Sequence, residues 1–256
     1  MKRVAVLLAP GFEEAEAIVT IDILRRLHID VETLACTTSR AVVSYHAIPM
    51  VADATLSERL DTLYDAVVLP GGPEGSVNLA ASAEVIAFVT RHDEAEKLIC
   101  PICSAAARVL GGNGLLKGRR YVCSGDLFET VTDGHYVDAA VVEDGNLISG
   151  KGLGRVFDFA FAVSARLLGD DAPVRDHADH IYYPLSFLST TKHSSGHKDK
   201  LAGLMDNSAT PLCICLTNTP ILMKIFAEFM HAFTVILRCD GALLWRINFP
   251  LKLLQQ

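Results

Sequence analysis

The stretch RVAVLLAPGFEEAEAIVTIDILRRL, residues 3–27, contains the two elements from which the fold can be predicted. Residues 3–9 form a continuous apolar run with β-branched side chains, which is typical of a strand buried on both faces of a parallel sheet. Gly11 permits a tight turn after this run. The residues that follow predict a helix, because acidic side chains fill the first turn and Arg25 and Arg26 fill the last. The apolar side chains at helical spacing, expected to face the core, are Ala17, Ile18, Ile21, Leu24 and Leu27.

The same alternation of strand and helix continues as far as residue 169. It predicts an α/β protein with a doubly wound, mostly parallel sheet and helices on both faces, in which ligands bind beyond the carboxyl ends of the strands. The predicted helices lie at 82–92, from 104 onward, and at 155–168 before Gly169. The predicted strands lie at 31–36, 64–70 and 97–102, near 119–123, 139–143 and 146–149, and in a hairpin near 41–51.

Charge and composition divide the chain of 256 residues into two parts. Residues 186–256 carry a net charge of +3 within a total of −7, so the remainder carries −10 and does not resemble a nucleic-acid-binding protein. We therefore predict a catalytic domain over 1–185 and an extension over 186–256. Within the extension, the apolar segment 221–237 contains Lys224, Glu228 and His231, which favours a buried or interfacial helix over a membrane span.

The amino terminus and the cysteines indicate the cellular compartment. Acidic residues interrupt the first apolar run too early for a signal peptide, so we expect a cytoplasmic protein. The seven cysteines are too sparse for a disulfide scaffold. Cys100 and Cys103 have the spacing of a redox pair, and this reading stays open. Cys213 and Cys215 lack a second pair at zinc-finger spacing, so we expect no metal site.

Three turns at strand ends carry the candidate chemistry, and a parallel sheet places them at one edge. Cys103 follows an apolar strand and precedes small residues that open a helix, which is the pattern of a nucleophile elbow. The helix amino terminus is expected to favour the thiolate. A buried, inert cysteine is the alternative. Gly71 and Gly72 end another strand and could offer free backbone N–H groups to an oxyanion, or form an ordinary turn.

Two further residues are candidates with plain alternatives. Glu16 lies one turn into the first helix between small apolar neighbours, where burial would raise its pKa and let it donate and accept protons. A solvated carboxylate at the helix start is the alternative. His135, in the segment TDGHY at 132–136, is either a site residue or an ordinary surface histidine.

Taken together, these motifs resemble the DJ-1/PfpI (ThiJ/PfpI) family, and in particular its DJ-1-like branch. The resemblance covers about residues 2–184. Four segments carry it, in the family's order: KRVAVLLAPGFEEAEAIVTIDILRR at 2–26, YDAVVLPGG at 64–72, LICPICSAAARVL at 98–110 and DGNLISGKGLGRVFDFAFAV at 144–163. Departures from the pattern include Ser104 and Ala106 beside the elbow and a shorter segment from Gly125 to Val142. In addition, Pro73 offers no N–H after the glycine pair, and His46 stands where the branch often has arginine.

The resemblance implies a flavodoxin-like fold, as in class I glutamine amidotransferases, and a homodimer that needs no cofactor. It implies that Cys103 is the nucleophile, Glu16 its acid partner, and the backbone N–H groups of Gly72 and Ser104 the oxyanion donors, and His135 matches the family's histidine. The implied function is that of a glyoxalase or deglycase acting on a small aldehyde or a glycated protein. Two alternatives stay open: an oxidative-stress sensor and chaperone, or a cysteine peptidase, which needs a Cys–His pair.

Overall fold

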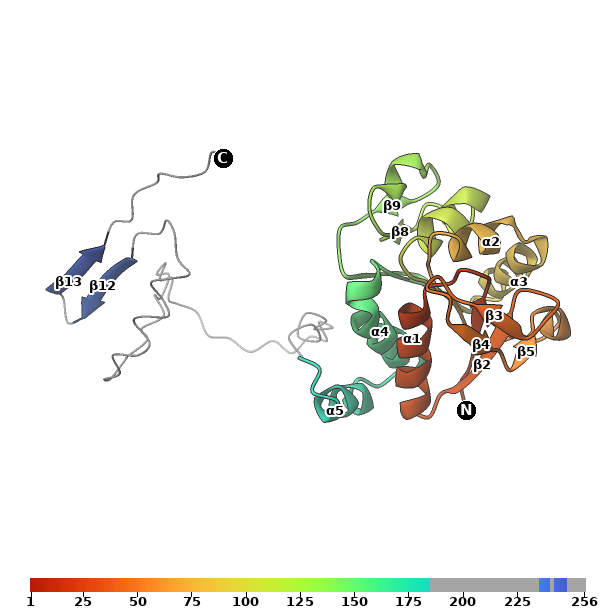
Figure 1. Cartoon of the computed structure of the whole chain (residues 1–256), viewed down its shortest axis with the longest axis horizontal. Coiled ribbons are helices and arrows are strands. Elements are labelled where there is room, and N and C mark those ends of the chain that lie inside the picture. The colour runs from red at the N-terminus through yellow and green to blue at the C-terminus, as the bar shows by residue number, and fades with distance from the viewer. Residues whose placement is uncertain (185–234, 240–241, 248–256) are drawn as a thin grey trace, which may run out of the picture. The chain divides into compact units, whose positions relative to one another are not determined.

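The computed structural model describes residues 1–184, 235–239 and 242–247 of the chain (Figure 1). The chain divides into two units, Met1–Ser194 and Ser195–Gln256. In the second unit, strands β12 (Val235–Cys239) and β13 (Ala242–Ile247) pair antiparallel. Strand β12 begins inside the segment 221–237 that was predicted as a helix, and the rest of that segment lies outside the described residues, as do Cys213 and Cys215. The predicted boundary at 185–186 stays a prediction.

The first unit is built on a seven-stranded sheet in the order β10-β11-β7-β6-β1-β2-β5. Every neighbouring pair is parallel except the pair β10 and β11, so the predicted doubly wound, mostly parallel α/β sheet is confirmed. The strands are β1 (Arg3–Leu8), β2 (Asp30–Ala35), β5 (Ala54–Thr55), β6 (Ala66–Leu69), β7 (Leu98–Pro101), β10 (Val141–Asp144) and β11 (Leu147–Gly150). Two small ribbons stand apart from this sheet: β3 (Ala41–Val43) with β4 (Pro49–Val51), and β8 (Arg120–Tyr121) with β9 (His135–Tyr136).

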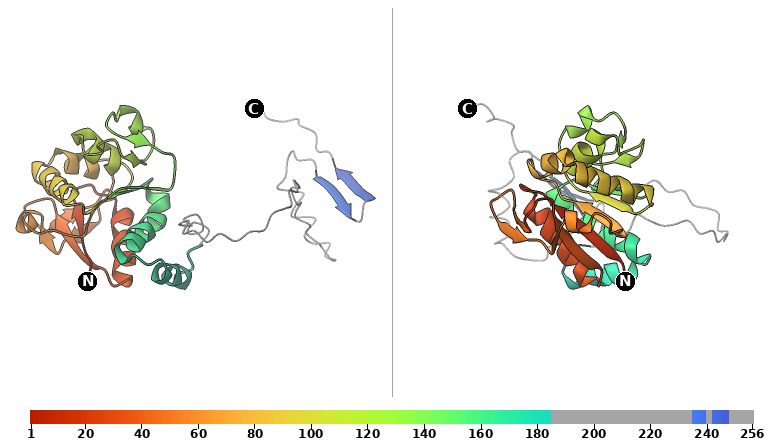
Figure 2. Two further views of the ribbon diagram at one scale, coloured as in Figure 1. Left: turned by 180° about the vertical axis from the view of Figure 1, so that it is seen from behind. Right: turned by 90° about the vertical axis from the view of Figure 1, so that its right-hand side faces the viewer.

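Helices cover both faces of the sheet (Figure 2). The α-helices are α1 (Glu14–Arg26), α2 (Gly75–Ala81), α3 (Ala83–Glu94), α4 (Val156–Leu168) and α5 (Ala172–His180). The short helices are η1 (Ser57–Arg59), η2 (Ala106–Leu110), η3 (Gly111–Asn113), η4 (Leu127–Thr130) and η5 (Leu153–Arg155). Helix α4 ends at Gly169, which adopts a left-handed conformation, as the sequence predicted.

The first strand is buried on both faces, which explains its continuous apolar sequence. Val4, Val6 and Leu8 pack into one core with α1 and α4, whereas Ala5 and Leu7 pack into the other core with α2 and α3. Among the apolar positions predicted to face the core in the first helix, Ile18 is the exception, since 49% of it is exposed. Two positions outside the predicted set, Thr20 and Ile23, are buried in α1. The buried face of the helix therefore differs from the predicted face at these three positions.

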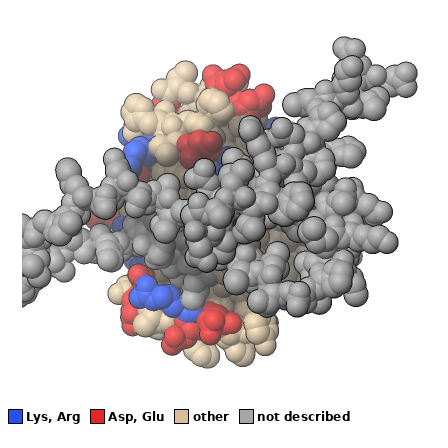
Figure 3. Space-filling model, turned by 90° about the vertical axis from the view of Figure 1, so that its left-hand side faces the viewer, with Lys and Arg blue, Asp and Glu red and all other residues tan. Residues whose placement is uncertain are grey.

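The strand order reverses at β1, which places a ligand-binding crevice at the carboxyl ends of β1 and β6. The turn that leads into α1 follows β1, Gly71 and Gly72 follow β6, and Cys103 follows the adjacent strand β7. The three turns predicted to carry the chemistry thus meet at one edge. Within the described residues, no helix is long and apolar enough to cross a membrane. On the part of the surface that Figure 3 shows in colour, acidic and basic side chains lie next to one another.

Candidate active site

Glu16 is the most deeply placed of the candidate residues, with none of its surface exposed. It is fixed by the start of α1, where the Glu13 side chain caps the helix by accepting the backbone N–H of Glu16 at 2.6 Å. Its Oε2 atom accepts the backbone N–H of Gly71 at 2.8 Å. Its Oε1 atom is buried and has no hydrogen-bond partner among the described residues. One oxygen is therefore anchored to the glycine turn, and the other is left for a proton or a ligand.

The environment of Glu16 favours its protonated form. Burial raises its pKa to about 7, and the charge of Glu13 acts in the same direction. Hydrogen bonds from Gly71 and from the Cys103 thiol oppose this rise without cancelling it. Close to neutral pH, the Glu16 carboxyl group can therefore both donate and accept a proton.

Cys103 occupies the sharp turn that the sequence predicted. Its φ of 61° lies in the left-handed region, which costs a residue with a side chain conformational energy and is common at functional turns. The conformation is held on both sides, since its N–H donates to Gly150 O at 2.9 Å and its carbonyl accepts the N–H of Ser124 at 3.2 Å. The helix that follows, η2, is a π-helix, a form often found at functional sites.

Gly71 separates the sulfur from the carboxyl group and leaves no room for a side chain. A β-carbon at this position would lie 2.8 Å from Oε2 of Glu16 and 3.1 Å from Sγ of Cys103. The two functional atoms therefore border the same small space next to the Gly71 backbone. The glycine pair in the sequence indicated this close approach.

The prediction that the Cys103 thiol has a lowered pKa is wrong. Burial raises the pKa of this thiol, and the negative charge of Glu16 raises it further. Hydrogen bonds from the Ser124 side chain and the Ser104 backbone N–H oppose the rise. The sequence placed Glu16 near Cys103 but could not show that the sulfur is largely enclosed, and burial is the larger cause of the raised pKa. Ser124 was not anticipated as a site residue, because it arrives from a loop with no recognisable motif.

The two predicted oxyanion donors lie on adjacent turns. The Ser104 N–H already points toward the sulfur of Cys103, as its hydrogen bond shows. Gly72 has a φ of 100°, and a β-carbon there would lie 2.4 Å from Gly11 O, so only glycine fits. Both residues are buried beside the nucleophile.

The structure does not bring His135 to the nucleophile. His135 is exposed on β9, where it pairs with Arg120, and its N–H donates to Arg119 O at 3.0 Å. No contact among the described residues joins it to Cys103 or Glu16. Cys100, the other half of the possible redox pair, is completely buried in β7, and burial raises its pKa. Both cysteines are free thiols.

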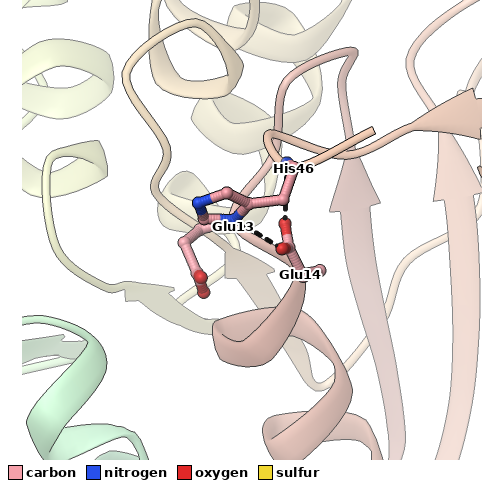
Figure 4. A group of neighbouring side chains, drawn as sticks. All are labelled: Glu13, Glu14 and His46. Carbon is pink, nitrogen blue, oxygen red and sulfur yellow. Dashed lines mark hydrogen bonds and ion pairs between the residues drawn. The ribbon is translucent and has the colours of Figure 1, made fainter. Parts of the chain in front are cut away.

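Glu13, Glu14 and His46 form a small polar group at the start of α1 (Figure 4). His46 Nδ1 lies 2.6 Å from Glu14 Oε1, and candidate ligand atoms of the three residues lie within 4.8 Å of one another. Although burial alone would raise the pKa of Glu14, hydrogen bonds from its own N–H, His46 and Ser44 lower it. The contact between His46 and Glu14 holds two members of this group together. It also ties the hairpin that carries His46 to the rim of the site.

Comparison with known proteins shows which family this sequence matches. The profile of the DJ-1/PfpI family matches residues 2–166. The chain is 34% identical to Protein DJ-1 homolog B of Arabidopsis thaliana over 65% of its own length, but it spans only 38% of that protein. It is 30% identical to the glutathione-independent glyoxalase DJR-1.2 of Caenorhabditis elegans, and this match covers 66% of the chain and 91% of the relative.

Among solved structures, the chain is similar to the DJ-1 superfamily protein STM1931 from Salmonella typhimurium, determined as a C103A mutant. The two share 81% sequence identity and a TM-score of 0.71. The match covers 72% of this chain and 100% of the Salmonella chain. The part of the sequence that forms the sheet, the elbow and the buried glutamate is thus the part shared with these relatives.

Proposed function

The chain belongs to the DJ-1/PfpI family, and on that premise we propose that it is a cofactor-independent enzyme that converts reactive 1,2-dicarbonyl compounds, or their protein adducts, into hydroxy acids. One observation carries the proposal: a buried carboxyl group with a pKa of about 7 shares a small space with the elbow cysteine. The glyoxalase name of one relative supports the same class of substrate.

The first step needs Cys103 and Glu16 as a pair. With both pKa values raised, the pair holds one proton between about pH 7 and the pKa of the thiol. Glu16 takes the thiol proton as the sulfur forms a bond to the aldehyde carbon, so the negative charge passes from the Glu16 carboxylate to the carbonyl oxygen. The N–H groups of Gly72 and Ser104 stabilise the oxygen that becomes negative, and Glu16 returns the proton to it to give a hemithioacetal.

The second step moves hydrogen between the two adjacent carbons. The Glu16 carboxylate removes the proton from the carbon bonded to sulfur, which leaves an enediolate, and then delivers it to the neighbouring carbon. The hydroxyl proton passes from the first oxygen to the second. The product is a thioester on Cys103, and water hydrolyses it to release a 2-hydroxy acid and the free thiol. Atoms and charge balance without an external oxidant or reductant.

A direct assay tests this proposal. Purified protein is incubated with methylglyoxal, and lactate formation is followed for the parent protein, Cys103→Ala and Glu16→Ala. We expect both variants to lose at least about a thousandfold in kcat/KM, because each removes a reacting group. Lactate formation that persists in both variants contradicts the mechanism, and absence of lactate from the parent protein contradicts the function.

A second candidate function is a redox sensor, and the carboxyl group near the sulfur favours it. Oxidation of Cys103 by a peroxide would give a sulfinate, and protonated Glu16 could donate a hydrogen bond to it. The raised pKa of the thiol weighs against rapid oxidation, since the thiolate is the reactive form. Mass spectrometry after mild peroxide treatment tests this role. The role requires Cys103 to gain two oxygens before the other cysteines are modified.

The third expectation, a cysteine peptidase, has less support. Such an enzyme activates its thiol with a histidine, and His135 has no contact with Cys103 among the described residues. Carboxyl activation by Glu16 suits an aldehyde substrate better than an amide, because an amide needs its leaving amine protonated.

We also propose that the protein is a homodimer in the cytoplasm, where the free thiols stay reduced. The support is a group of exposed apolar side chains on the hairpin β3–β4, on α1, and on the segment from η5 into α4. They are Ile18, Val43, Tyr45, Ile48, Val51, Leu153 and Phe157, each 38–74% exposed. The hairpin is tied to the site turn, since Tyr45 N–H donates to Phe12 O at 2.8 Å. Light scattering on the parent protein and on Ile18→Glu tests this: we expect twice the monomer mass and loss of dimer, respectively.

A further inference from the structure

The turns that bear the two proposed oxyanion donors are joined by a buried network of polar groups outside the reacting centre. Ser76 Oγ donates to Gly72 O at 2.8 Å, and Ser104 Oγ donates to Ser76 Oγ at 2.9 Å. Ser104 Oγ also lies 3.4 Å from Gly72 O. Ser76 is completely buried, and Ser104 is 5% exposed. The serine hydroxyls thus connect the turn after β6 to the turn after β7.

Arg108, a residue of the elbow helix η2, extends this network. Its Nη1 atom donates to Pro73 O at 2.8 Å and to Ser76 Oγ at 3.1 Å. The carbonyls of Gly72 and Pro73 follow one another in the turn, and Pro73 has no N–H to anchor it. Serine hydroxyls hold the first carbonyl, and the guanidinium holds the second. Each of these contacts therefore restrains the glycine turn or the elbow, and none of them involves the sulfur.

We propose that Ser76 and Arg108 are positioning residues that fix the N–H groups of Gly72 and Ser104 on the oxygen of the substrate. The proposal rests on the proposed function, since it assigns a role in the same reaction. A glycine pair has more freedom than any other dipeptide, so its N–H direction is defined only if the neighbouring carbonyls are held. Oxyanion donors accelerate a reaction only when they are aligned before the charge develops. The network supplies this alignment without touching the substrate.

The main test replaces each residue and compares it with a matched control. Ser76→Ala is paired with Ser164→Ala, because the Ser164 hydroxyl is also buried and donates to a carbonyl four residues earlier, Ala160 O, at 2.8 Å. Arg108→Met is paired with Arg91→Met, because Arg91 donates to a loop carbonyl, Thr62 O, at 2.6 Å. We expect Ser76→Ala and Arg108→Met to lower kcat about tenfold, with KM within about twofold, and we expect both controls to leave kcat unchanged. Arg108→Lys, which keeps one donor, should lose less than Arg108→Met.

A second readout separates positioning from damage to the nucleophile. Alkylation of Cys103 by iodoacetamide forms no oxyanion, so its rate should be unchanged in Ser76→Ala and Arg108→Met. Unchanged kcat, or an equal loss in kcat and alkylation rate, overturns the proposal. Controls that lose as much kcat as the test variants overturn it as well.

A third readout does not depend on turnover. Trimethylacetaldehyde, which has no adjacent carbonyl, can only add reversibly to the thiol and protect it from iodoacetamide. Ser76→Ala should need about tenfold more aldehyde for equal protection than the parent protein, because the adduct oxygen loses aligned donors. If the parent protein makes no lactate yet shows this difference, the proposed function fails and the positioning role stands. Equal protection in both proteins overturns the positioning role.

Discussion

Two buried carboxyl groups at opposite ends of the sheet have opposite environments. Asp93, at the end where β7 begins, is 6% exposed and binds Lys117 and Arg119, each at 2.7 Å, and Asn146 at 2.9 Å. These partners outweigh the effect of burial and lower its pKa. Glu16, at the carboxyl ends of the strands, has no cationic partner within ion-pair distance among the residues that the structure describes, and burial raises its pKa to about 7. The buried carboxyl group of Asp93 is thus stabilised as an anion by its partners, whereas that of Glu16 can gain or lose a proton near neutral pH.

The difference supports the assignment of the proposed chemistry to the edge at which Glu16 lies. A buried charge is tolerated when hydrogen bonds and counter-ions surround it, and Asp93 meets that requirement. Glu16 meets it only in its protonated form, so the fold bears a cost at that position whenever the carboxylate forms. The absence of counter-ions around the Glu16 carboxyl group, among the described residues, therefore distinguishes this site from the other end of the sheet.

The largest expected effect comes from Glu16→Gln, which keeps an oxygen for the Gly71 N–H and removes the titrating proton. We expect kcat/KM to fall about a thousandfold or more. Because the pKa in the folded state is raised, the stability contribution of Glu16 is present below its usual pKa of 4.5 and is lost as pH rises through about 7. Glu16→Gln should therefore be about 3 kcal/mol more stable than the parent protein at pH 8, with the gain vanishing near pH 4.5. Urea unfolding at the two pH values measures it, and a loss of stability at pH 8 contradicts the assignment.

Asp93→Asn provides the opposite result. It removes the anion from a buried group of cations and should cost about 3 kcal/mol of unfolding free energy at pH 7, because Arg119 is then left underpaired. Activity measured well below the melting temperature should stay within about twofold of the parent value, since the residue lies at the other end of the sheet. A large drop in kcat in a folded Asp93→Asn protein would show that the two ends are coupled.

Two glycines, one at each end of the sheet, separate a steric role at the site from backbone strain. In Gly71→Ala the new methyl group would lie 2.7 Å from Cβ of Cys103, so we expect about a hundredfold loss of kcat/KM from displacement of the reacting pair. Gly145, in the turn next to Asn146, has a φ of 60°, and no atom of the described part of the chain would lie within 4 Å of a β-carbon there. Gly145→Ala should cost about 1 kcal/mol in stability through backbone strain alone and leave kcat unchanged. Comparable losses of kcat in both variants would contradict a local steric role for Gly71.

The smallest effect is a change in pH dependence. Below about pH 7 both groups of the reactive pair are protonated, so kcat/KM should fall by about tenfold per pH unit and level off above pH 7. The same profile is expected for Asp93→Asn, because the pKa of Asp93 in the parent protein is lowered and lies far below pH 7. A midpoint near pH 4.5 would show that Glu16 is solvated during the reaction.

The sequence predicted the features that depend on local pattern. The apolar run at 3–9 predicted a strand buried on both faces, and Gly71 and Gly72 predicted the close approach of backbone to the site. The position of Cys103 after a strand and before small residues predicted its sharp turn, and the structure shows a positive φ there. These features can be read from a sequence because they are set by backbone conformation and by the period of the side chains.

Other features depend on contacts between distant segments, and the sequence did not disclose them. The pKa of the Cys103 thiol is raised because the fold encloses the sulfur and places Glu16 beside it. Ile18 has the spacing of a core residue yet is exposed, and the helical period alone does not show how wide a face of α1 the core covers. Ser76 and Ser124 lie in segments without motifs, and although Arg108 lies in the elbow segment, only the folded chain shows that its side chain reaches the glycine turn.

The left-handed backbone at position 103 also bears on how this protein would evolve in the laboratory. Glycine adopts that conformation without strain, so Cys103→Gly should give a more heat-resistant protein with no nucleophile. A library screened for thermal tolerance alone would enrich such chains. Selection for chemistry must therefore act continuously to keep sulfur at this position.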